Sequence, residues 1–126
     1  LLELMLDSEP ETTEAPHHSA ATLQRVRDFM RNNLADHELT PGTVAKSAGI
    51  SVRYLHKLYA GSGITFGKAL LAMRLEKANQ LTKSDHSHAT LQQIAFACGF
   101  NSQSHFSTAF KAHFGISPSL ARNKTI

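Results

Sequence analysis

Apolar residues recur along most of this chain at spacings of three and four, which is the period of one face of an α-helix. The pattern predicts a first helix over about residues 22–35, five further helices separated by caps and glycines, and a last helical turn after Pro118. No stretch alternates apolar and polar residues over the length of a strand. The sequence therefore predicts an all-α fold of about seven helices.

Capping residues and glycines set the expected ends of the helices in the first half. Thr40 is an N-cap with Pro41 at the first helical position, and Gly49 ends the short helix that they begin. Ser51 caps the next helix. A longer helix follows over about residues 65–83, roughly 28 Å at 1.5 Å per residue.

The C-terminal part repeats the short helices. A capping box at Thr90 begins a helix that ends at Gly99. Asn101 or Ser102 caps the next helix, which Gly115 ends.

Two segments about fifty residues apart share one pattern: residues 44–50 read VAKSAGI and residues 94–100 read IAFACGF. The alanine lets a second helix cross closely, the glycine permits a turn with positive φ, and the next apolar residue fills the shared core. We expect two helix-turn-helix units, over about residues 41–60 and 90–114, joined by the helix over 65–83. The polar face of each second helix is then free to enter a major groove.

Charge is unevenly distributed along the chain. Residues 1–20 hold five acids and no Lys or Arg, so residues 21–126 hold 13 basic and 5 acidic side chains. This excess suits a polyanionic partner, because each neutralised phosphate releases counterions, but a solvated basic surface would show the same excess. Among the remaining acids, we expect Glu76 to pair with a neighbouring base, Arg74 or Lys77.

The sequence lacks the residues that several kinds of site and segment require. A single Cys98 precludes an internal disulfide and fits a reducing cytoplasm, and no apolar run approaches the roughly 18 residues that span a bilayer. The histidines, such as His17 and His18 in a linker and His86 and His88 in a loop, form no ligand set. No nucleophile–base pair is present. We expect no metal, cofactor, membrane association or enzymatic activity.

A stripe of Phe106, Phe110 and Phe114 is predicted to be core, because a spacing of four places these rings on one helix face. His105 and His113 flank the stripe and are expected to pack or to contact phosphates.

Two segments carry a family resemblance. GISVRYLHKLYAGSGITFGKALLAMRLEKANQL and IAFACGFNSQSHFSTAFKAHFGISPS resemble the halves of the DNA-binding domain of AraC/XylS-type bacterial transcription regulators, over about residues 22–122. The resemblance implies seven helices, with two helix-turn-helix units joined by a long central helix. It also implies a domain over residues 21–126 that follows a ligand-sensing or dimerisation domain. Residues 1–20 would then be the end of that upstream domain plus an acidic linker.

For function, the resemblance implies sequence-specific binding of double-stranded DNA at a promoter operator, with two recognition helices in successive major grooves. It implies a cytoplasmic regulator that acts chiefly as an activator and touches RNA polymerase. A small-molecule effector would act only through the missing upstream domain.

The family's base-reading positions transfer onto two sets of residues. In the first recognition helix they fall on Arg53, His56 and Lys57. In the second they fall on Gln103, Ser104, Ser107 and Thr108, and Lys111 is a candidate phosphate contact. Arg53 matches guanine O6 and N7, and Gln103 matches adenine N6 and N7. Many relatives have arginine in place of Thr108, so we expect the second helix either to discriminate weakly among bases or only to position the domain.

Two alternatives remain open from the residues alone. One is a helical module whose basic surface binds an acidic protein. The other is a nucleoid-type protein that reads DNA shape rather than base sequence.

Overall fold

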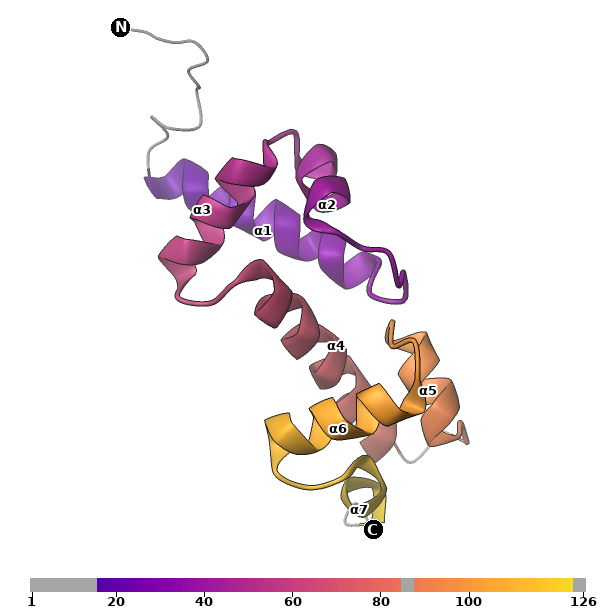
Figure 1. The fold of residues 1–126 in the computed structure, drawn as a ribbon. Coiled ribbons are helices and arrows are strands. Elements are labelled where there is room, and N and C mark those ends of the chain that lie inside the picture. The colour runs from indigo at the N-terminus through magenta and orange to yellow at the C-terminus, as the bar shows by residue number, and fades with distance from the viewer. Residues whose placement is uncertain (1–15, 85–87, 124–126) are drawn as a thin grey trace, which may run out of the picture. The chain divides into compact units, whose positions relative to one another are not determined.

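The computed structural model describes residues 16–84 and 88–123, which contain seven helices and no strand, so the predicted all-α class is confirmed. The chain forms two compact units. One comprises the described residues up to Asn32 together with Leu39–Phe66, and the other comprises Asn33–Glu38 with the residues from Gly67 onward. Figure 1 labels the helices: α1 Pro16–Asn32, α2 Pro41–Ala48, α3 Val52–Ser62, α4 Phe66–Lys83, α5 Leu91–Ala97, α6 Gln103–Phe114 and α7 Pro118–Asn123.

Helix α1 begins earlier than its apolar pattern indicates, at Pro16 rather than Thr22. Proline suits a first helical turn because its φ is fixed and its missing N–H would have no partner there. The residues that follow are small or polar, so they show no apolar period. Residues 16–20, predicted as linker, are therefore helical. The rest of the expected linker and the upstream segment, residues 1–15, lie outside the described residues.

The first unit is built from three helices around one core. Helix α2 packs against both α1 and α3. The buried core includes Val26 and Met30 from α1, Val44 from α2, and Leu55 and Tyr59 from α3. The Tyr59 hydroxyl donates to the Met30 sulfur at 3.3 Å. Burial raises the pKa of Tyr59, so this donor stays protonated at neutral pH and helps fix α3 to α1.

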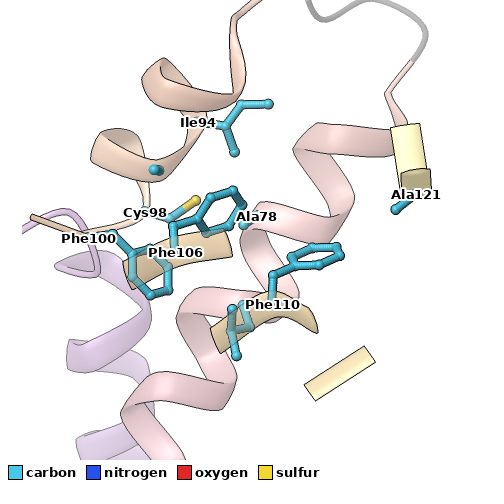
Figure 2. Packing of buried hydrophobic residues seen from close by; sticks show 9 residues of the cluster. Ala78, Ile94, Cys98, Phe100, Phe106, Phe110 and Ala121 are labelled. Atoms are coloured by element: carbon cyan, nitrogen blue, oxygen red, sulfur yellow. The ribbon is translucent and has the colours of Figure 1, made fainter. Parts of the chain in front are cut away.

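The second unit is organised around two phenylalanines of α6. Phe106 and Phe110 are fully buried with ring centroids 5.6 Å apart, and Figure 2 shows Phe106 beside Ala78 of α4 and close to Cys98. Phe114 is only half-buried, at the edge of this cluster. Burial raises the pKa of the Cys98 thiol, which keeps it protonated and apolar in character.

Polar contacts fasten the surface of the second unit. Glu76 on α4 pairs with His113 on α6 at 3.6 Å, so the expected pairing of Glu76 with Arg74 or Lys77 is wrong. The Arg122 guanidinium of α7 donates to the Ala89 carbonyl at 2.8 Å. Both contacts join residues more than thirty positions apart in the sequence, so a pattern of neighbouring residues could not predict them.

Residues 16–84 and 88–123 contain neither a membrane-spanning helix nor a cluster of metal-ligating side chains. No helix there combines the length and apolar content needed to cross a membrane. In the same ranges, no three His, Cys, Asp or Glu side chains lie close enough together to hold a metal ion. His86, one of the histidines considered above, lies outside the described residues.

The Phe106→Ala substitution should destabilise the second unit by about 3–5 kcal/mol, because it removes a fully buried ring from a close-packed cluster. The matched control is Phe96→Ala, since Phe96 is 41% exposed and its loss should cost less than about 1 kcal/mol. Urea unfolding gives both values. Cys98 is the single cysteine and is buried, so its reactivity with a thiol reagent reports opening of this unit. Unchanged stability of Phe106→Ala would contradict the packing described here.

Candidate nucleic-acid interface

The turn between α2 and α3 is short and fully capped. Gly49 adopts φ +72°, and the next residue, Ile50, donates its N–H to the Ala45 carbonyl at 3.0 Å. The Ser51 hydroxyl then accepts the Tyr54 N–H at 3.0 Å and begins α3. The left-handed glycine reverses the chain direction within three residues, so α3 crosses α2 closely.

The turn between α5 and α6 repeats this geometry. Gly99 adopts φ +93°, and Phe100 donates its N–H to the Ala95 carbonyl at 2.9 Å. The Ser102 hydroxyl accepts the His105 N–H at 3.1 Å and caps α6, so Ser102 rather than Asn101 is the N-cap. The repeat seen in the sequence therefore has the same closing hydrogen bond in both copies, with one extra residue in the second turn.

The two turn glycines have different surroundings. A Cβ on Gly49 would meet nothing within 4 Å. A Cβ on Gly99 would collide with the Leu34 carbonyl oxygen and would lie 2.6 Å from Nε of Arg74. The second turn therefore requires glycine for space as well as for φ.

Helix α3 buries one face and exposes the other. Tyr54, Leu55, Leu58 and Tyr59 are buried. The three predicted contact residues of this helix, Arg53, His56 and Lys57, are all exposed on the opposite face. Because α3 is anchored through its tyrosines and leucines, these three side chains point away from the core of their unit.

Helix α6 has the same division with different chemistry. Four of its five predicted contact residues are exposed and Ser107 is half-buried; the exposed ones are Gln103, Ser104, Thr108 and Lys111. Within residues 16–84 and 88–123, none of the eight predicted side chains on α3 and α6 bonds to another residue. Their donors and acceptors are therefore available to a ligand.

The sequence did not identify one group of contacts in the second unit. Arg74 on α4 donates to the carbonyls of Leu34 at 3.1 Å and Asp36 at 2.7 Å. The His37 ring nitrogen Nδ1 lies 2.9 Å from the Gly99 carbonyl. Burial lowers the pKa of Arg74, yet an arginine stays charged at any physiological pH. The segment 33–38 is thereby held against the turn that precedes α6.

The histidines of α6 both have partners inside the second unit. His105 lies edge-on to Phe100, with centroids 5.6 Å apart, and it lines a hollow of about 270 Å³ beside Arg74. His113 packs edge-on against Phe114 and pairs with Glu76. These contacts agree with the predicted packing role of both residues, and a phosphate contact stays a prediction.

A helix-turn-helix unit that presents an exposed polar helix face defines a class of DNA-binding proteins. The structure contains this unit twice, so the chain has the features of that class of DNA-binding proteins.

Known proteins agree with this class. A family model described as "Helix-turn-helix domain" matches residues 44–124. The transcriptional activator NphR of a Rhodococcus species is 38% identical over 114 residues, which are 90% of this chain and 33% of that protein. The transcriptional activator RhaS of Escherichia coli O139:H28 is 34% identical over 116 residues, 91% of this chain and 41% of that protein.

A solved structure shows that the similarity to transcription regulators includes the fold as well as the sequence. The crystal structure of a transcriptional regulator from Chromobacterium violaceum, described as AraC-type DNA-binding domain-containing, gives a TM-score of 0.79 at 31% identity. It covers 86% of this chain and 96% of that one. The chain therefore belongs to the AraC-type family of helix-turn-helix DNA-binding domains, which is not an enzyme family. It spans less than half the length of either named activator.

Substitution of the two turn glycines should have unequal costs. Gly49→Ala should destabilise the protein by about 1–2 kcal/mol, because alanine is strained at positive φ but meets open space. Gly99→Ala carries the same strain plus a collision, so it should cost about 1–3 kcal/mol more. Denaturant unfolding of both variants measures the difference. Equal costs would show that the second turn relaxes freely around a methyl group.

Proposed function

We propose that this chain binds double-stranded DNA in a sequence-specific manner as the DNA-binding domain of a transcription regulator. In this proposal α3 and α6 are recognition helices that enter successive major-groove segments. The observation that carries it is the pair of exposed polar helix faces, each behind the same capped turn and each free of partners among the described residues. Membership of a DNA-binding family supports it independently.

The α3 face is suited to guanine and to phosphate. The Arg53 guanidinium has no partner among the described residues, so its parallel N–H groups are free to fork onto guanine O6 and N7. Lys57 lies one turn further along the same face, where an ammonium group neutralises a backbone phosphate. His56 lies between them as a further donor to a base edge.

The α6 face is suited to uncharged contacts. Gln103, at the first position of the helix, can pair with adenine N6 and N7. The hydroxyls of Ser104, Ser107 and Thr108 can meet base edges or phosphates. Lys111 is the only lysine or arginine of α6 and is proposed to hold a phosphate.

The larger protein is proposed to be an activator. Both named relatives carry that description, and this chain matches only a part of each. Activation would require a contact with RNA polymerase, and control by a small molecule would require a sensing domain joined to residues 1–20. We place such a regulator in the cytoplasm, with its DNA. A domain over residues 21–126, extended to Pro16 by α1, would then be its DNA-binding part.

Salt dependence distinguishes DNA binding from an interaction with an acidic protein. With about five phosphate contacts, log affinity should fall against log salt concentration with a slope near −4 to −5. The measurement is fluorescence anisotropy on a site selected from random DNA by the purified chain. A specific site should bind at least about 10³-fold more tightly than bulk DNA. A flat salt dependence would favour a protein partner, and equal affinity for all DNA would favour a shape-reading protein.

Arg53→Ala should weaken binding to the selected site by about 1–3 kcal/mol and relax the preference at one base pair. Stability should stay unchanged, because the Arg53 side chain is exposed and makes no bond within the described structure. The matched control is Arg53→Lys, which keeps the charge but loses the planar fork. It should therefore retain the salt slope while losing base preference. If Arg53→Ala lowers affinity equally for all sequences, Arg53 contacts a phosphate and the assignment to a base is wrong.

A further inference from the structure

One apolar side chain lies on the otherwise polar face of α3. Val52 is the first residue of this helix, directly after the N-cap Ser51, and it is 40% exposed. It is next to Arg53 and one turn before His56, so it shares their exposed side of the helix. The other aliphatic side chains of α3 longer than alanine, Leu55 and Leu58, are buried.

Helix propensity and capping do not favour a valine here. Valine is a poor helix former, and its side chain cannot cap the exposed N–H groups of a first turn. Three other large apolar side chains in the described part of the chain are similarly exposed: Ile64, Phe96 and Leu120. None of these three lies on α3 or α6. Val52 is therefore the one exposed large apolar side chain on a proposed recognition helix.

The chemistry of valine restricts what it can recognise. It has no hydrogen-bond donor or acceptor, so it gains nothing from a phosphate oxygen or from the polar atoms of a base edge. The major groove presents one apolar group, the 5-methyl of thymine. Recognition helices contact base edges through their N-terminal residues, which is where Val52 lies.

We propose that Val52 is a specificity-determining residue that packs against the 5-methyl group of a thymine in the half-site bound by α3. This inference rests on the proposed function, because it requires α3 to lie in a major groove. It adds a prediction about the DNA: a thymine lies close to the base read by Arg53. In this proposal the preference for thymine at that position comes from its methyl group, and base-pair shape and hydrogen bonding contribute less.

The test replaces single thymines of the selected site by deoxyuridine. This change removes only the methyl group and preserves base pairing. For the unmodified 126-residue chain, deoxyuridine at one position should lower affinity by about three- to fivefold, the effect of one methyl group leaving an apolar contact. For Val52→Ala, affinity for the thymine site should fall by a similar factor, and the same deoxyuridine should then have almost no further effect.

Two control variants complete the experiment. Ile64→Ala removes another exposed apolar side chain that lies off α3, so it should leave the sensitivity to deoxyuridine intact. Val52→Thr keeps the branched shape and one methyl group, and it should retain part of that sensitivity. Circular dichroism and thermal unfolding check that each variant folds, which is expected because both side chains are substantially exposed.

The outcomes separate this inference from the proposed function. If deoxyuridine has no effect at any position, or the same effect in Val52→Ala, Val52 does not read a methyl group and the inference is overturned. In that case the proposed function still stands if a specific site was selected and Arg53→Ala relaxed it. If no specific site is selected at all, the proposed function is wrong, and the inference about Val52 is wrong with it.

Discussion

The closed turn between paired helices is the constraint on which the rest of this structure depends. In each unit a glycine at positive φ lets the following N–H reach back to the carbonyl of a buried alanine, Ala45 or Ala95. The alanine allows the helices to approach, and the closing hydrogen bond fixes where the second helix begins. A capped start and a fixed buried stripe then determine which side chains face outward. The polar faces of α3 and α6 are thus a consequence of turn geometry, and the residues on them are free to vary in chemistry.

That freedom is used differently in the two units. The α3 face offers one guanidinium, one ammonium and one imidazole, with an apolar valine at its beginning, whereas the α6 face offers an amide, hydroxyls and a single ammonium. A forked guanidinium discriminates strongly among bases, while hydroxyls accept several partners. A single chain with two such unlike faces suits a DNA site whose halves differ in sequence. A symmetric dimer of identical helices would instead require a palindrome.

Most of this architecture could be predicted from the sequence, because its determinants act over three or four residues. Thr40, Ser51 and Thr90 cap their helices as predicted, Ser102 is one of the two caps considered for α6, and Gly49 and Gly115 end α2 and α6. Helix α5 ends at Ala97 with Cys98 rather than Gly99 as its C-cap. Contacts between residues far apart could not be predicted. Arg74 bonds to carbonyls 38 and 40 residues away, and Glu76 pairs with His113 rather than with a neighbouring base. The start of α1 was missed because small and polar residues have no apolar period. The candidate contact residues were found through the family resemblance; seven of the eight are exposed and Ser107 is half-buried. The base that each one reads depends on the DNA as well as on the fold.

The unequal surroundings of the two glycines show how one motif acquires different structural demands. At Gly49 the space beyond the turn is open, so only φ requires glycine. At Gly99 the backbone lies directly against the Leu34 carbonyl and the Arg74 guanidinium, and His37 bonds to the glycine carbonyl itself. The turn that positions α6 is therefore held from outside the motif as well as by its own closing hydrogen bond. Arg74 supports this turn through two backbone carbonyls, those of Leu34 and Asp36, and the charge of Asp36 also acts on its guanidinium. Loss of the Arg74 guanidinium would leave both carbonyls without this donor.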